Sequence, residues 1–537
     1  MSVELESSFI SLRKEYIKPC CKPVYRVIWL KNKGAILIII WSYLVSSMFF
    51  LLRAGYKKMT EKDNVPFTGI ILVGSTLLYP IGGWLADTRI GRYKVILYSM
   101  WVMWIGTMLA TFNEVLAHVT TVYQARSDVK IAIYEVLCVI MAIGFGGFQS
   151  NIVQFGIDQL PYASAVEITS FIRWYTLTLF ASGLTLHYVS DCIVEEYNMF
   201  YVKLLVVAIC LTLALSSVFL FQQWLVKEQV TENALHLVLK VIQYAVKNRK
   251  VRYDFSAMEK LPSPFDVAKY THGGAFTTQQ VDSVRTFLWM LVIISVCAIV
   301  GGAIPPLEYA KDKTESHVPK NSGLRECYMN LLTHYNSCFF AIAVVMLYEF
   351  IVHPLFSRCL PIVSITSKFL FGTVCLLIWI ISVLVIERAS YQEEWNLRNV
   401  TWNCILTEKH EVHIYFNSIW LVIPGFISGL SNFLLILSGL EFIWSQAPMT
   451  MKGLTLGCMY ALLGLSVLLH TSITSPFVFV KHIPWDHAPL TCRMWYFLME
   501  GVIILVVLIV TGVLVKKYKK RNELFDPGYT SSSMNYT

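Results

Sequence analysis

The stretch GGWLADTRIGRYK, at residues 82–94, joins two long apolar segments and decides how the rest of the chain is interpreted. Its small residues Gly82 and Gly83 allow two helices to approach closely. Asp87 and Arg92 carry opposite charges across a turn short enough for the side chains to pair. Charges held at the end of a helical bundle can stabilise one arrangement of the bundle and separate in another. The predicted gating motif comprises Gly83, Asp87, Arg89, Gly91 and Arg92.

The alternative interpretation of this stretch is a basic loop that only fixes the orientation of the chain in a membrane. Apolar segments recur along the whole chain, because 56% of its 537 residues are hydrophobic and 15% are charged. A typical soluble protein carries roughly 25% charged residues, so the composition predicts a membrane protein. A spanning helix needs roughly 20 mostly apolar residues. We predict about twelve such spans, at residues 34–54, 67–87, 93–113, 130–150, 168–190, 199–223, 284–305, 337–357, 361–386, 413–438, 448–470 and 492–515.

The predicted spans divide into two sets of six around a long polar stretch. The predicted organisation is a cytosolic segment 1–33, a six-helix bundle 34–223, a cytosolic linker 224–283, a second six-helix bundle 284–515 and a cytosolic tail 516–537. Most of the 44 Lys and Arg residues fall on the side of the N-terminus, which the positive-inside rule assigns to the cytosol. The same rule explains the net charge of +9, so we expect a lipid bilayer and no nucleic acid as partner. The first apolar run is too long and too late for a cleavable signal peptide.

The linker contains a pattern of apolar residues with helical spacing, which begins at Leu235 and leads into a basic cluster that starts at Lys247. One interpretation is a basic amphipathic helix lying on anionic lipid headgroups. The other is a simple tether between the two bundles.

The 13 cysteines show neither a disulfide framework nor the spacing of a metal site. Cys138 and Cys458 lie inside apolar runs, where we expect them to act as small hydrophobic residues. Cys327 and Cys404 fall in predicted extracytosolic loops, where a disulfide is permitted. Asn399 begins a glycosylation sequon in one of these loops. Phosphate-binding loops and nucleophile elbows are absent from the sequence, which therefore indicates neither an enzyme nor a cofactor.

Residues 82–94 resemble the loop 2–3 signature of the major facilitator superfamily, and more closely its form in the proton-dependent oligopeptide transporter family, also called the peptide transporter family. The resemblance continues in chain order over nearly the whole sequence. It implies the major facilitator fold, with twelve helices in two bundles, and movement of a small solute by alternating access. The other matching segments are FGIDQL at 155–160, FIRWY at 171–175, YEF at 348–350, HPL at 353–355, LEFIWSQAP at 440–448, and Met451 with Lys452.

Three acidic residues of these segments, Asp158, Glu349 and Glu441, stand near predicted membrane boundaries. An ionisable group within a membrane is a functional candidate by default. Their boundary positions favour a structural role, in which the carboxylates cap helix ends or pair with basic loop residues.

The resemblance fails at the positions that line the family's central cavity. The family's E-x-x-E-R in the first helix, which is associated with proton coupling and the peptide carboxylate, becomes Ser42, Val45 and Ser46. The family's lysine in helix 4 becomes Gln149, and its glutamate in helix 10 becomes Asn432. The predicted cavity residues are therefore neutral: Ser42, Ser46, Gln149, Asn151 and Asn432.

A zwitterionic peptide in an apolar cavity needs opposite charges to replace water at its two ends. Ser, Gln and Asn supply no charge and carry no proton at physiological pH, so the replaced motif does not support proton coupling. Two hypotheses follow. The first is transport of a small organic solute, such as an oligopeptide or a peptide-like metabolite, with protons as an open partner. The second is a transporter-like sensor or scaffold without turnover. We expect a multi-pass protein of the plasma membrane, with an endolysosomal membrane as the alternative.

Overall fold

The computed structural model describes residues 32–63, 76–119, 127–188, 200–227, 234–248, 265–302, 314–315, 336–352, 365–397, 416–417, 420, 422–478 and 490–517. Over these ranges the fold is helical, with one short parallel pair of strands, β1 (Thr314–Glu315) and β2 (Phe416–Asn417). The predicted glycosylation site Asn399 and the cysteines Cys327 and Cys404 lie outside the described residues.

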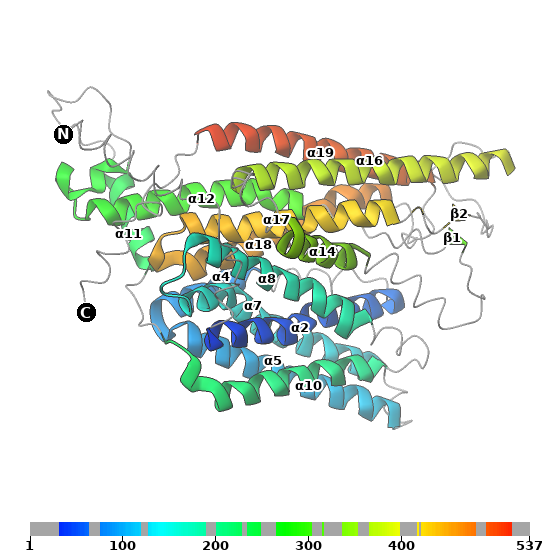
Figure 1. Ribbon diagram of the computed structural model, residues 1–537, viewed down its shortest axis with the longest axis horizontal. Coiled ribbons are helices and arrows are strands. Elements are labelled where there is room, and N and C mark those ends of the chain that lie inside the picture. The colour runs from blue at the N-terminus through cyan, green and yellow to red at the C-terminus, as the bar shows by residue number, and fades with distance from the viewer. Residues whose placement is uncertain are drawn as a thin grey trace.

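The N-terminal half is a bundle of helices that lie side by side in the lower part of Figure 1. The helix that starts at Ala165 begins with a capping box. The Ser164 hydroxyl accepts a hydrogen bond from the Glu167 N–H, and the Glu167 carboxylate accepts one from the Ser164 N–H. The elements are α2 (Lys33–Asp63), α4 (Tyr79–Leu85), the π-helical turn η2 (Ala86–Ile90), α5 (Arg92–Val119), α7 (Ser127–Asp158), α8 (Ala165–Ser182), η3 (Gly183–His187), α10 (Phe200–Phe221) and η4 (Gln222–Trp224).

The C-terminal half forms the upper part of the same view (Figure 1). Its helix α18 packs against α12 within this half and also against α4 and α7 of the other half, so it lies at the centre of the molecule. The elements are α12 (Thr278–Gly302), α14 (Asn336–Leu347), η9 (Tyr348–Val352), α16 (Ile365–Leu397), α17 (Val422–Gln446), η11 (Met449–Met451), α18 (Lys452–Val478) and α19 (Leu490–Lys517).

Each predicted span overlaps one of these helices, and seven helices of the described residues are long and apolar enough to cross a membrane. The total of twelve spans and the cytosolic location of both termini stay predictions. The end of the linker, predicted at residue 283, differs from the structure because α12 begins at Thr278. The cause is a capping box that the apolar pattern does not reveal. The Thr277 N–H donates to the Gln280 side chain at 3.1 Å, and the Gln280 N–H donates to the Thr277 hydroxyl at 3.2 Å.

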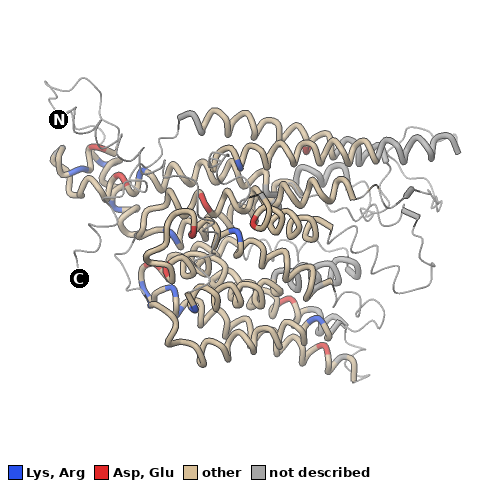
Figure 2. The backbone as a smooth tube through the Cα atoms, in the orientation of Figure 1, with Lys and Arg blue, Asp and Glu red and all other residues tan. Residues whose placement is uncertain are grey.

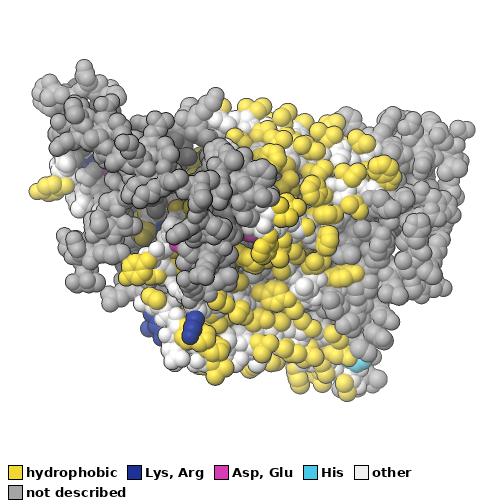
Figure 3. Space-filling model, in the orientation of Figure 1, with side chains coloured by type: hydrophobic (Ala, Val, Ile, Leu, Met, Phe, Trp, Pro, Cys, Tyr) yellow, Lys and Arg dark blue, Asp and Glu magenta, His cyan; other side chains and the backbone are white. Residues whose placement is uncertain are grey.

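The outer faces of both halves carry large apolar side chains, such as Phe112, Leu220, Ile381 and Ile509, each more than half exposed. Figure 3 shows a broad hydrophobic surface across the middle of the face in view. Figure 2 shows that charged residues are sparse along the helices. A surface of this kind is suited to hydrocarbon and not to water. The chain is therefore a multi-pass integral membrane protein.

The linker includes α11 (Ala234–Lys247) and the short turns η5 (Asp266–Ala268) and η6 (Tyr270–His272). The apolar face of α11 is divided. Val238 and Val241 are buried in a cluster with Val284 of α12, whereas Leu239 and Val246 are exposed. This packing attaches α11 to the start of α12, and both interpretations of the linker, a helix on lipid headgroups and a tether, stay predictions.

Candidate gate and solute site

Contacts between helix ends show which ends share one side of the molecule. The side chain of Asn32, just before α2, donates to the carbonyl oxygen of Gln159, just after α7. The ammonium group of Lys33 lies 5.1 Å from the centroid of the Trp224 ring, which follows α10. Helix α2 thus begins on the side where α7 and α10 end, as expected when successive helices cross the membrane in opposite directions. We call this side of the bundle, marked by Asn32, Gln159 and Trp224, the gate end.

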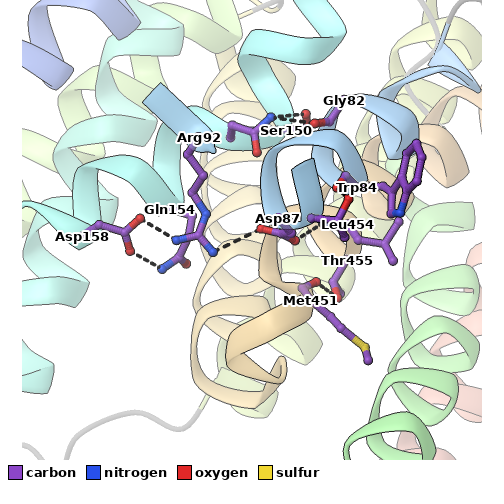
Figure 4. A network of polar contacts seen from close by, with 12 residues as sticks. Gly82, Trp84, Asp87, Arg92, Ser150, Gln154, Asp158, Met451, Leu454 and Thr455 are labelled. Carbon is purple, nitrogen blue, oxygen red and sulfur yellow. Dashed lines mark hydrogen bonds and ion pairs between the residues drawn. The ribbon is translucent and has the colours of Figure 1, made fainter. Parts of the chain in front are cut away.

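Residues of the predicted gating motif form a polar network at the gate end (Figure 4). Asp87 Oδ2 accepts the backbone N–H of Leu454, in the first turn of α18, at 2.9 Å. Its Oδ1 lies 3.2 Å from Nη2 of Arg92, whose Nη1 lies 2.6 Å from Oδ2 of Asp158. Gln154 donates to the other Asp158 oxygen at 2.9 Å. Asp87 therefore joins the N-terminal half to the C-terminal half, and we call Asp87, Arg92, Asp158 and Leu454 the latch.

The latch places a charge where water has little access, because Asp87 is only 4% exposed. Burial disfavours the charged form of the Asp87 carboxyl, and the contacts with the Arg92 guanidinium and the Leu454 N–H offset that cost. A buried carboxylate is tolerated only while its partners remain in place. The latch consequently favours the closed gate end, and separation of the halves would return Asp87 to water.

Glycines allow the two halves to meet at the gate end. A Cβ atom on Gly83 of α4 would lie 2.1 Å from the carbonyl oxygen of Gly453 at the start of α18. Gly91 has φ 87°, a conformation that residues with a side chain rarely adopt, and it turns the chain from η2 into α5. Arg89 is exposed and forms no ion pair with a described residue, so the structure places it outside the latch.

A second polar cluster lies on α7 at Gln149, nine residues before Asp158 and therefore about 13 Å along the helix from the latch. The Gln149 amide donates to the hydroxyl oxygens of Tyr175 on α8, at 2.8 Å, and Tyr460 on α18, at 2.9 Å. The ring of Tyr79 packs edge-on against that of Tyr460, with centroids 6.1 Å apart. We call Gln149, Tyr79, Tyr175 and Tyr460 the central cluster, and it also joins the two halves.

The other predicted cavity residues are not part of this cluster. Ser42 and Ser46 are buried, and each hydroxyl donates to a carbonyl oxygen of α2 itself. Asn432 is partly buried and donates to a serine hydroxyl one turn earlier on α17, at 3.4 Å. Asn151 donates to the carbonyl oxygen of Gly82 at 3.2 Å, so it fastens α7 to α4 beside the latch.

The three predicted structural acids each pair with a basic residue. Asp158 pairs with Arg92 in the latch. Glu349 in η9 pairs with Nε of Arg173 on α8, and the side chains are 2% and 6% exposed, so this buried pair joins the two halves. Glu441 pairs with Lys368 at 2.7 Å within the C-terminal half.

The sequence reasoning missed the partners Arg173, Lys368, Tyr175 and Tyr460. Lone basic residues inside apolar runs are a usable signal, because a charge in the membrane requires a partner. Arg173 and Lys368 fit this description. The two tyrosines carry no such signal among 28 tyrosines.

Comparison with known proteins gives relatives that match part of the chain. No family model matches the chain. The protein NRT1/PTR family 5.2 of Arabidopsis thaliana is 24% identical over 258 residues, which cover 45% of this chain and 43% of the relative. NRT1/PTR family 5.15 of the same plant is 24% identical over 204 residues, which cover 35% of this chain and 36% of the relative. The matched part thus spans less than half the length of these relatives.

Solved structures share the fold over nearly the full chain. The POT family transporter PepTSo has a TM-score of 0.62 at 14% identity and covers 91% of this chain and 98% of its own. The proton:xylose symporter XylE, of the major facilitator superfamily, has a TM-score of 0.54 at 12% identity and covers 88% of this chain and 94% of its own. The fold is that of these POT and major facilitator transporters, and parts of the sequence are similar to NRT1/PTR family proteins.

Proposed function

We propose that this protein carries a small organic solute of the peptide or peptide-like class across a membrane by alternating access. The central cluster supports this proposal best, because Gln149 contacts hydroxyl groups from both halves, Tyr175 and Tyr460. A solute that enters between the halves would replace these hydrogen bonds. Binding of the solute would then change the relative stability of the open and closed arrangements.

Polar contacts between the two halves support a closed state of the gate end. Asp87 with Leu454 and Arg173 with Glu349 are polar contacts that cross between the halves, and neither leaves a charge without a partner. Both would have to break when the gate end opens.

The chemistry of the central cluster favours an uncharged polar solute. One amide and three phenol groups surround the contact between the halves, and all of them are neutral at physiological pH. Neutral donors and acceptors compensate poorly for the desolvation of two full charges. A peptide-like metabolite with blocked ends therefore fits this cluster better than a free zwitterionic dipeptide.

The test is uptake into proteoliposomes of a labelled dipeptide, in a free and in an end-blocked form. We expect uptake of the blocked form to exceed that of the free form. A chain that takes up neither form, nor any solute of a small metabolite panel, would contradict the proposal. A fluorescent fusion tests the proposed plasma membrane location against the endolysosomal alternative.

Tyr460→Phe is expected to weaken the apparent affinity for the solute about fivefold, because one hydroxyl worth about 1 kcal/mol is lost while the ring stays in place. Concentration-dependent uptake measures the effect. Tyr98→Phe is the matched control, since Tyr98 is 55% exposed on α5. Equal effects of the two substitutions would show that the central cluster is not part of the solute site.

A sensor or scaffold without turnover is the second candidate. It is favoured by the neutral residues at the family's charged positions, since Ser42, Val45 and Ser46 are all buried and the two hydroxyls bond within their own helix. Purification of a cytosolic protein in stoichiometric amount with this chain would support that function, and robust solute uptake would count against it.

A further inference from the structure

A buried titratable pair lies in the C-terminal half and belongs to neither the latch nor the central cluster. His470 Nδ1 on α18 lies 2.7 Å from Glu500 Oε1 on α19. His470 Nε2 lies 2.8 Å from the carbonyl oxygen of Ile299 on α12. The side chains of His470 and Glu500 are 6% and 1% exposed. One imidazole thus connects three helices.

The two hydrogen bonds determine how many protons the pair holds. A carbonyl oxygen only accepts, so Nε2 must carry a hydrogen that it donates to Ile299. The contact between Nδ1 and Oε1 then needs one further proton, held either by the imidazolium or by the carboxylic acid. If that proton is lost, a carboxylate faces the lone pair of a neutral imidazole and the pair carries a buried negative charge.

The surroundings make this loss unfavourable. Phe497 and Ile504 flank Glu500 on α19 and pack in one apolar cluster with Val300 of α12 and Trp379 of α16. Glu500 Oε2 is buried without a hydrogen-bond partner among the described residues. A net charge in such a place is costly unless it is paired.

The charged groups whose side chains the structure describes lie far from the pair on the helices packed around it. They are Asp282 and Arg285 at the start of α12, Lys368 on α16, Lys452 at the start of α18 and Glu441 on α17, which pairs with Lys368. Each of the first four stands at least three helical turns, or about 16 Å, along its helix from the level of the pair.

We propose that His470 and Glu500 form a binding site for one proton, and that loss of this proton weakens the hold of α12 and α19 on α18. Helix α18 also carries Leu454 of the latch and Tyr460 of the central cluster. Its position therefore affects both the gate and the solute contact. The proton site stands on geometry alone, whereas its use in coupling rests on the proposed function.

The sign of the pH effect follows from the proton count. In the unfolded chain the His side chain loses its proton at about pH 6.5. The folded pair keeps its proton to a higher pH, so above about pH 7 folding takes up one proton. The stabilisation that the pair gives to the folded state is complete below about pH 6.5 and declines as pH rises. The equilibrium constant for unfolding then increases by at most about tenfold per pH unit.

The substitution Glu500→Gln removes the need for the extra proton and keeps both hydrogen bonds of His470. The Gln amide can donate to Nδ1 of a neutral imidazole, so both hydrogen bonds persist without the extra proton. We expect the thermal midpoint of the full chain in nanodiscs to fall by about 1 °C per pH unit between pH 7 and 9. The midpoint of E500Q is expected to stay level over that range. His118→Gln, at an exposed histidine near the end of α5, is the matched control and should keep the wild-type slope.

Equal slopes for the wild type and E500Q would overturn the proton site. If E500Q does not fold, the apolar pair H470L/E500L replaces it with the same expected level profile, since apolar replacement of a buried ion pair is often tolerated. Solute uptake with and without an inward proton gradient tests the coupling separately. Gradient-stimulated uptake that is lost in E500Q supports coupling through this pair, and uptake that ignores the gradient in both proteins overturns it. A wild type without any uptake would defeat the proposed function, while the slopes would still decide the proton site.

Discussion

Gly83→Ala is expected to reduce solute uptake at least about tenfold while the protein stays folded. The added Cβ would lie 2.1 Å from the Gly453 carbonyl oxygen, where about 3.5 Å is needed. The three nearest atoms, Gly453 O and C and Leu454 N, all belong to backbone, so α4 and α18 must move apart by roughly 1.4 Å. The closed gate end would lose its packing and also the Asp87 contact with Leu454. Initial uptake rates in proteoliposomes, normalised to the amount of monodisperse protein, measure the effect.

The matched control is Gly512→Ala on α19, where a Cβ meets no atom within 4 Å. We expect this variant to transport at the wild-type rate. Normal uptake by the Gly83→Ala variant would show that close contact between α4 and α18 is not needed for turnover.

Arg173→Met is expected to reduce the population of the closed gate end more than about a hundredfold. The substitution leaves Glu349 buried without its ion-pair partner, and breaking a buried pair in this way costs about 3–5 kcal/mol. Because the pair joins α8 to η9, the cost falls on the arrangement in which the two halves are in contact. Accessibility of an introduced cysteine near the interface, or a label distance across the gate end, reports the population.

The pair between Lys368 and Glu441, whose side chains are 16% and 1% exposed, provides the control because it lies within the C-terminal half. Lys368→Met should lower the thermal midpoint without opening the gate end. The double variant Arg173→Met with Glu349→Leu should recover much of the closed population, because no unpaired charge remains. If Arg173→Met and Lys368→Met acted alike, the effect of Arg173 would be one of general stability.

The fold was accessible from sequence because the bilayer imposes a length and a polarity on each span. The stretch at 82–94 also indicated its own chemistry, since Asp87 and Arg92 do pair. Its partner on the other half, the backbone N–H of Leu454, could not be predicted, because any residue supplies that donor. The start of α12 was misplaced for a related reason. The capping box at Thr277 is local chemistry that a search for apolar runs does not detect.

The central contacts were harder to predict because they depend on which helix faces meet. Gln149 and Tyr460 are separated by 311 residues, and His470 and Glu500 by 30, so spacing along the chain says nothing of their contact. Alignment with the family's charged positions gave Gln149 and Asn432 as cavity residues. In the structure Gln149 contacts both halves, whereas Asn432 bonds within its own helix, and their role towards a solute stays a prediction.

The most direct test of alternating access is a distance measured across the gate end. Tyr162, after α7, and Met449, before α18, are 83% and 65% exposed and belong to different halves. Spin labels attached there through non-natural amino acids avoid the 13 native cysteines. The account predicts a short distance for the closed gate end and a second, longer distance whose population changes when solute is added. A single distance that no solute alters, in protein that also shows no uptake, would contradict transport by this chain.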